Sequence, residues 1–128
     1  MILDTSAVVA IANREPAHEQ LLQKLQTADL VAVGAPTLTE SSIVLAARFG
    51  AAGERWLLGL VEQASVEIVP FDRAHWLLAV EAWRRYGRGR HRASLNFGDC
   101  LSYATAKQAA RPLLCVGEDF AHTDIALA

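Results

Sequence analysis

Four carboxylates stand where short apolar runs give way to polar sequence or where helical segments begin. Asp4 follows the first apolar run of the chain, and Asp119 lies just beyond the last one. Glu40 and Asp99 lie near the starts of two segments with helical periodicity. An all-oxygen set of ligands, without His or Cys among them, is what hard divalent cations prefer. These residue types therefore predict a carboxylate site for Mg²⁺, with Mn²⁺ as the alternative.

A carboxylate-bound metal site suits phosphoryl transfer to water. The metal lowers the pKa of a bound water, orients it and neutralises charge on the phosphate, so no Ser, Cys or His nucleophile is needed. The sequence contains neither a P-loop nor a GxGxxG stretch. These absences argue against nucleotide-dependent kinases, ATPases and dehydrogenases.

The elements that must position the acids can be predicted from the hydrophobic pattern. Strand-like apolar runs cover residues 1–3, 30–35, 66–71 and 112–116, and segments with helical periodicity cover 6–13, 17–28, 37–49, 53–64, 74–86 and 98–110. Strands separated by helices require crossover connections, which give a parallel sheet covered on both faces. We therefore predict one α/β domain over residues 1–128, a three-layer α/β/α sandwich with a central parallel sheet of four to five short strands. Sites in such sheets form beyond the carboxyl ends of the strands, where the four acids should meet.

Each acid also has an ordinary structural explanation. Asp4 is a typical N-cap for the helix that follows it, and the acid after the last strand is a typical loop residue. Glu40 with Thr37, and Asp99 with Asn96, have the spacing of a capping box. Taken singly, none of the four acids distinguishes a cap or loop from a catalytic site.

Two features favour a shared site over four separate caps. Glu40 lies on the same helical face as Ile43 and Val44, so its carboxylate should point towards the core, where a charge must be paired or metal-bound. No Lys or Arg lies within two residues of Asp4, Glu40 or Asp99. Uncompensated carboxylates that are brought together repel, and a divalent cation is the usual remedy.

Three stretches of the chain resemble the PIN-domain ribonucleases, and most closely the VapC toxin branch of the VapBC toxin–antitoxin systems. They are "MILDTSA" at the N-terminus, "LNFGDCLSYATA" in the last helical segment and "LLCVGEDFAHTDI" near the C-terminus, with an isolated Glu40 between the first two. The resemblance covers essentially the whole chain. It implies a PIN-like fold and a Mg²⁺-dependent endoribonuclease that acts as a toxin. It also implies a cognate VapB-like antitoxin that binds over the active site.

The resemblance assigns roles to the acids by position. Asp4, Glu40 and Asp99 match the first three acids of the family. Many relatives carry the fourth directly after the last strand, where this chain has Gly117. Asp119 is the predicted fourth acid, and the substitutes for it are Glu118 and Asp124.

The same resemblance suggests how the acids are used. Asp4 and Asp99 are the predicted direct metal ligands, while Glu40 and Asp119 are expected to act through water or a second ion. Hydrogen-bond donors that hold the carboxylates are predicted at Thr5, Ser6, Asn96 and Thr123.

One segment concentrates the positive charge of the chain. Residues 84–92, "RRYGRGRHR", hold five of the twelve Lys and Arg residues and no acid, although the net charge is −2. We predict a flexible clamp for RNA phosphates at this segment, with Tyr86 available to stack on unpaired bases. The alternatives are a solvated surface loop and a seat for the antitoxin. The clamp would consist of Arg84, Arg85, Arg88, Arg90 and Arg92.

Other features of the sequence indicate which partners and which cellular location to expect. The chain has no basic segment before its first apolar residues, no apolar run of the roughly 18–20 residues that cross a bilayer, and two cysteines without a CxxC motif. We therefore expect a cytoplasmic protein that does not contact membranes. Trp56, Trp76 and Trp83 lie on helical stripes and are expected in the core or in an interface. The many Leu- and Trp-rich helices predict that a second copy, as in a homodimer, or an antitoxin helix covers part of the surface.

Two other functions remain open alternatives. A non-catalytic RNA-binding module could keep the fold, although four carboxylates near RNA would oppose binding. A phosphoryl-accepting α/β domain of the receiver or haloacid-dehalogenase kind also places an aspartate at a strand end. The receiver kind needs an early acid pair and a late lysine, and the phosphatase kind needs Asp-x-Asp after its first strand, whereas this chain has Asp4, Thr5 and Ser6.

Overall fold

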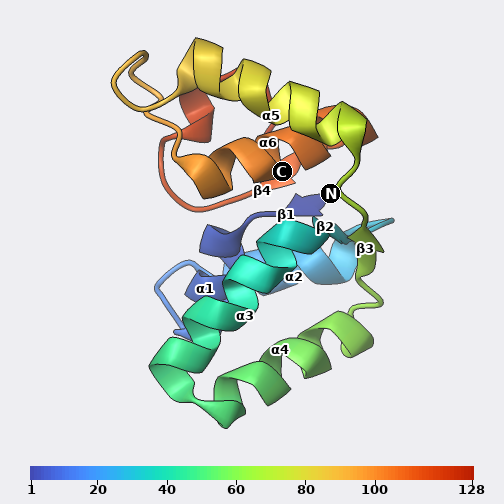
Figure 1. Cartoon of the computed structure of the whole chain (residues 1–128). Helices are drawn as coiled ribbons and strands as arrows, with labels where there is room; N and C mark the ends of the chain where they lie inside the picture. The colour runs from blue at the N-terminus through green and yellow to red at the C-terminus, as the bar shows by residue number, and fades with distance from the viewer.

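A four-stranded, all-parallel sheet with the order β3-β2-β1-β4 forms the middle layer of the protein. The computed structural model describes all 128 residues (Figure 1). The strands are β1 (Ile2–Leu3), β2 (Ala32–Gly34), β3 (Glu67–Val69) and β4 (Leu113–Leu114). The helices are α1 (Thr5–Ala12), α2 (His18–Thr27), α3 (Ala35–Phe49), α4 (Ala51–Gln63), α5 (Arg73–Tyr86) and α6 (Phe97–Ala109), followed by the 3₁₀ turn η1 (Phe120–His122). The predicted α/β class and three layers are confirmed, with four strands.

The two faces of the sheet are covered by different helices, because successive strand residues point to opposite sides. Ile2 and its register partners Ala32 and Leu113 pack in one core with side chains of α5 and α6. Leu3 and its partners pack in a second core with side chains of α1, α2, α3 and α4. Figure 1 shows α5 and α6 on one side of the sheet and the first four helices on the other. Two residues per strand are therefore enough to join both cores.

Helix α6 lies unusually close to the sheet. A Cβ at Gly34, the last residue of β2, would lie 2.6 Å from the Thr105 hydroxyl oxygen of α6. Only glycine permits this approach without displacing the helix. The contact fixes the depth of α6 and thereby the position of its first turn, which carries Asp99.

Helix α3 begins at Ala35, two residues before the predicted start. Gly34 caps it and Pro36 lies in its first turn, where a missing N–H costs nothing. Thr37 is therefore inside the helix, and its hydroxyl pairs with that of Ser102 at 3.2 Å. The capping-box alternative for Thr37 and Glu40 is wrong. None of the helices combines the length and the apolar composition that a bilayer crossing requires.

Candidate active site

Asp4 joins the end of β1 to the start of α1. Its Oδ2 accepts hydrogen bonds from the Ser6 backbone N–H at 2.9 Å and from the Ser6 hydroxyl at 2.5 Å, so Asp4 is the N-cap of α1. The Ser6 hydroxyl oxygen also accepts a bond from the Val116 N–H at 2.9 Å, beyond the end of β4. Asp4 is 4 % exposed, yet its Oδ1 accepts no hydrogen bond from the protein. The cap therefore uses one oxygen and leaves the other available to a ligand.

Glu40 lies in the second turn of α3 and is held from α1. Its Oε2 accepts a 2.6 Å hydrogen bond from the Thr5 hydroxyl. The Ser41 hydroxyl lies 3.4 Å from the same Thr5 oxygen, so the two helices are linked through hydroxyl groups. The Oε1 of Glu40 accepts no bond from the protein. Thr5 and Ser6 thus hydrogen-bond to two different carboxylates.

Gly98, in the first turn of α6, leaves room for the Glu40 carboxylate. A Cβ at residue 98 would lie 2.7 and 2.8 Å from the two carboxylate oxygens. Because Glu40 is long and flexible, its carboxylate can move away at small cost to folding. We expect Gly98→Ala to lower RNA cleavage by about 10–100-fold, the range seen when support of a site is lost. The melting temperature should change little; a large fall with full specific activity would contradict this role of Gly98.

Asp99 lies in the first turn of α6 and forms a reciprocal cap with Asn96. The Asn96 backbone N–H donates to Asp99 Oδ2 at 2.8 Å, and the Asp99 N–H donates to Asn96 Oδ1 at 2.9 Å. The Oδ1 of Asp99 accepts no bond from the protein. Burial, together with the negative charges of Asp4, Asp119 and Glu40, raises the pKa of Asp99 to about 6, although the Asn96 N–H favours ionisation. The capping box and the acidic site are therefore both present at this residue.

The candidates for the fourth acid have different surroundings. Asp119 is exposed, its side chain makes no hydrogen bond as the N-cap of η1, and its charge raises the pKa of Asp99. Burial followed by the charges of Asp4, Asp99 and Asp119 also raises the pKa of the Cys115 thiol to about 11. Glu118 is exposed and is not among the charges that raise either pKa.

Both carboxylate oxygens of Asp124 accept hydrogen bonds from side chains of α6. It accepts the Tyr103 hydroxyl at 2.7 Å on one oxygen and the Lys107 ammonium at 2.9 Å on the other. Arg85 lies 3.5 Å from the second oxygen. Burial raises the pKa of Asp124, but the bonds from Lys107 and Tyr103 outweigh it and bring the pKa down to about 2. Asp124 therefore joins α5, α6 and the C-terminal segment, whereas Asp119 has no such partners.

The acids fit a divalent cation in chemistry but do not form a closed ligand sphere. Three carboxylates, from the β1–α1 junction, α3 and α6, each keep one oxygen without a protein partner. No three His, Cys, Asp or Glu side chains stand close enough together to enclose a metal ion. Their charges nevertheless raise the pKa of Asp99, and no cation of the chain pairs with Asp4, Glu40 or Asp99. A hard cation would relieve this repulsion.

Thr123 does not contact any of the acids. Its hydroxyl donates to the Phe120 carbonyl at 2.8 Å and accepts the Ile125 N–H at 3.3 Å. It closes the turn after η1 instead of holding a carboxylate. The donors that contact the acids are Thr5, Ser6 and the backbone of Asn96.

The arginine segment begins in the last turn of α5, which contains Arg84 and Arg85, and continues as a hydrogen-bonded loop. The Arg88 N–H donates to the Leu95 carbonyl and the Leu95 N–H donates to the Tyr86 carbonyl, at 3.0 and 2.9 Å. Leu95 and Ala93 are fully buried, and the His91 ring packs edge-on against Tyr86. Tyr86 is only 8 % exposed, so its predicted role of stacking on bases is wrong.

The five arginines of the predicted clamp divide into two groups. Arg85 is committed to the protein, since it contacts Glu81, Asp124 and the Tyr86 hydroxyl. The others are exposed and form no ion pair: Arg84, Arg88, Arg90 and Arg92. The guanidinium of Arg90 lies 4.0 Å from the centre of the Trp83 ring.

The tryptophans line the surface and not the core. Trp56, Trp76 and Trp83 are 36, 54 and 45 % exposed. Helix α5 buries Ala79, Ala82 and other residues against α6, which leaves its two tryptophans at the rim of the contact. The expectation of a core position is wrong, and an interface role is untested.

Comparison with known proteins places the chain in a family. The PIN domain family matches residues 1–126. Ribonuclease VapC of Mycolicibacterium smegmatis is 44 % identical over 126 residues, which cover 98 % of each chain. Ribonuclease VapC30 of Mycobacterium tuberculosis is 42 % identical over 126 residues, 98 % of this chain and 96 % of the relative.

Solved structures agree on the fold. VapC20 of Mycobacterium tuberculosis, described as a Sarcin-Ricin loop cleaving toxin, has a TM-score of 0.79 at 15 % identity and covers 99 % of this chain and 97 % of its own. A toxin–antitoxin complex from Klebsiella pneumoniae contains a chain with a TM-score of 0.76 at 16 % identity, over 99 % of this chain and 95 % of its own. The receiver and phosphatase alternatives are therefore wrong. The chain belongs to the PIN-domain family and, within it, to the VapC ribonucleases, the endoribonuclease toxins.

Proposed function

We propose that this protein cleaves RNA by hydrolysis at a divalent-metal site formed by Asp4, Glu40, Asp99 and Asp119. One observation carries the proposal. Asp4, Glu40 and Asp99 come from distant parts of the chain, and each is fixed by a hydrogen bond to one oxygen while the other oxygen is unpartnered. A structural cap needs no second free oxygen on each of three neighbouring acids. Before a cation binds, its site should contain carboxylates that repel one another and that each keep one oxygen without a partner.

The chain's own residues supply positioning and electrostatics. In this proposal Asp4 and Asp99 hold a Mg²⁺ or Mn²⁺ ion directly, while Glu40 and Asp119 act through water or a second ion. The ion supplies an activated water and neutralises charge on the phosphate. Ser6 and Asn96 keep the two direct ligands oriented, and Thr5 keeps Glu40 against the turn at Gly98. The hydrogen bonds to the carboxylates thus prepare the site before substrate arrives.

The exposed arginines are proposed to bind the RNA backbone. Replacing Arg88, Arg90 and Arg92 together by Gln removes three cations that have no acidic partner in the protein. We expect weaker RNA binding and a shallower dependence of log K on log salt, by about 0.7 per lost phosphate contact on single-stranded RNA. Arg111→Gln, which removes an arginine paired with Asp29, is the matched control. An unchanged salt slope in the triple variant would leave the loop without a role in RNA binding.

We further propose that a cognate VapB-like antitoxin covers the acidic edge of this toxin, and that the protein acts in the cytoplasm. The toxin–antitoxin complex among the similar structures supports an antitoxin partner. We also propose a homodimer, supported by the large apolar side chains of Ile43, Phe49 and Leu58 that remain exposed on α3 and α4. Light scattering on the isolated chain tests the dimer.

The activity is tested by mapping RNA 5′ ends in cells that express the wild type or Asp4→Asn. New, discrete 5′ ends in the wild type alone would support the proposal. Identical 5′ ends in both would exclude a nuclease that works through Asp4. RNA binding without new ends would favour the non-catalytic RNA-binding module.

A further inference from the structure

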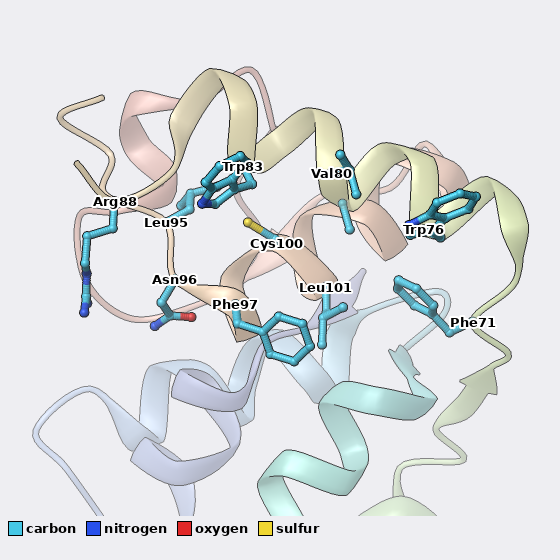
Figure 2. A pocket seen from close by; sticks show the side chains of 11 residues that line it. Phe71, Trp76, Val80, Trp83, Arg88, Leu95, Asn96, Phe97, Cys100 and Leu101 are labelled. Carbon is cyan, nitrogen blue, oxygen red and sulfur yellow. The ribbon is translucent and has the colours of Figure 1, made fainter. Parts of the chain in front are cut away.

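An open groove of about 610 Å³ runs between α5 and the start of α6 (Figure 2). Trp76, Val80 and Trp83 of α5 line one side, and Phe97 and Leu101 of α6 line the other. Arg88 and Asn96 stand at the end nearest the arginine loop. The groove is therefore aromatic along its walls and polar at one end.

Phe97 is the most exposed large apolar residue of the groove, at 81 %. It is the first residue of α6, next to Gly98, which packs against the Glu40 carboxylate, and two residues before Asp99. An aromatic ring so exposed adds little to the core. Its place beside the acids puts a flat apolar surface within one nucleotide of a phosphate bound at the acidic edge.

The polar end of the groove offers hydrogen-bond donors. Asn96 uses its side-chain Oδ1 to accept the Asp99 N–H, so its amide Nδ2, which has no partner in the protein, is the group left for a ligand. Arg88 is exposed and forms no ion pair. Neither free group can accept a hydrogen bond. A ligand edge that carries acceptors is complementary to this end, and an edge that carries only donors is not.

We propose that the groove is a subsite for one unpaired nucleobase of the RNA, which stacks on Phe97 beside the scissile phosphate. Aromatic walls provide sequence-tolerant stacking, and the arginines at the open end match the charge of the flanking phosphates. The donors of Asn96 and Arg88 favour a keto base, above all guanine, whose O6 and N7 both accept hydrogen bonds. The subsite rests on the proposed nuclease function and adds to it a preference for single-stranded RNA with a guanine next to the cleaved bond.

The test measures RNA binding separately from cleavage. The Asp4→Asn protein, which should not cleave, is titrated by fluorescence anisotropy with short single-stranded RNAs that carry one guanine or one adenine at the tested position. Phe97→Ala in this background should weaken binding about tenfold, within the range for loss of one stacked base, and Phe97→Tyr should restore it. Trp56→Ala, on α4 and outside the groove, is the matched control and should bind as the parent does.

Base preference separates a subsite from a structural role. Asn96→Ser keeps an oxygen that can cap α6 but lacks the amide donor, so it should reduce the preference for guanine over adenine. Unchanged binding in Phe97→Ala, or a preference that is the same in Asn96→Ser, would overturn the subsite. So would a change of molecular mass by light scattering in Phe97→Ala, since the groove would then be a contact between copies of the chain.

The subsite and the nuclease proposal fail in different ways. If the wild type cleaves RNA and Phe97→Ala cleaves it with the same KM and the same sites, only the subsite is wrong. If the wild type neither binds nor cleaves any RNA, the proposed function is wrong and the subsite with it. Support requires a higher KM with little change in kcat for Phe97→Ala, together with relaxed base preference.

Discussion

Asp99→Asn is expected to abolish RNA cleavage, by on the order of 10³-fold or more, and to raise the melting temperature of the metal-free protein at pH 7. Asparagine can still accept the Asn96 N–H through its side-chain oxygen, so the start of α6 should persist. It cannot contribute the negative charge that a divalent cation needs. Substitutions in an active site can stabilise a protein at the cost of its function. Here burial and the charges of Asp4, Asp119 and Glu40 all oppose ionisation of Asp99.

The stabilisation should depend on pH in a defined direction. Burial and like charges raise the pKa of Asp99 from 3.8 to about 6 in the folded protein. The folded state therefore binds the proton of Asp99 more tightly than the unfolded state does. The resulting contribution to the free energy of unfolding is fully present below about pH 4 and is lost as the pH rises through about 6. The melting temperature of Asp99→Asn should match that of the wild type near pH 4 and exceed it at pH 7, by several degrees for about 1–3 kcal/mol.

Thermal denaturation in a chelator, repeated with Mg²⁺, checks both halves of this prediction. Mg²⁺ should stabilise the wild type more than Asp99→Asn, because the cation replaces the lost proton. Glu54→Gln, an exposed acid on α4, is the control for removing a negative charge anywhere on the surface. Equal melting temperatures of wild type and Asp99→Asn at pH 7 would show that the acids do not repel as described.

Asp119→Asn and Asp124→Ala are expected to have opposite effects. Asp119 is exposed and makes no side-chain hydrogen bond, so Asp119→Asn should lower cleavage by about 10–100-fold without lowering the melting temperature. Asp124→Ala leaves the hydroxyl of the buried Tyr103 and the Lys107 ammonium without their acceptor. It should cost about 1–3 kcal/mol of stability and retain cleavage at temperatures where the protein is folded.

The pair decides which residue is the fourth acid. Cleavage rates at 25 °C and melting temperatures are measured on both variants and on the wild type. The stabilising contribution of Asp124 should also fade as the pH falls from 4 towards 2, because its pKa is lowered to about 2 in the folded protein. Loss of cleavage in Asp124→Ala with an unchanged fold would reverse the assignment.

The order of elements followed from sequence pattern, because strands and helices differ in hydrophobic period. All four strands and six helices occur where the apolar runs and stripes predicted them, with ends shifted by at most two residues. The shift at α3 has a clear cause: Gly34 ends β2 and caps the helix at once, so Ala35 and Pro36 belong to the first turn. A capping box at Thr37 would require α3 to begin after Thr37.

The meeting of the acids was predictable from the parallel sheet, but their precise partners were not. Asp4 and Asp99 are both caps, and local spacing could not decide whether they are also site residues, because it fits either role. Asp124 and Asp119 are equivalent in sequence, since both follow the last strand. Only the packing of Tyr103 and Lys107 on α6 shows that Asp124 is already neutralised.

Tertiary packing also determines which aromatic residues are exposed and how the basic loop is held. The stripe Trp76, Val80 and Trp83 looked like the buried face of α5. That face is formed instead by His75, Ala79, Ala82 and Tyr86, and the two alanines allow close approach to α6. The arginine loop is ordered by burial of Ala93 and Leu95, which no charge pattern reveals.

RNA cleavage by this protein should depend on a divalent cation held by the carboxylates of Asp4, Glu40, Asp99 and Asp119. The most direct test is the single-turnover rate of cleavage of an RNA identified from the 5′-end maps, measured against free Mg²⁺ from chelator alone to saturation. We predict no cleavage in the chelator, a saturable rise with Mg²⁺, recovery with Mn²⁺, and no rise at any concentration for Asp4→Asn. Full cleavage in the chelator, or a wild-type rate in Asp4→Asn, would contradict the claim.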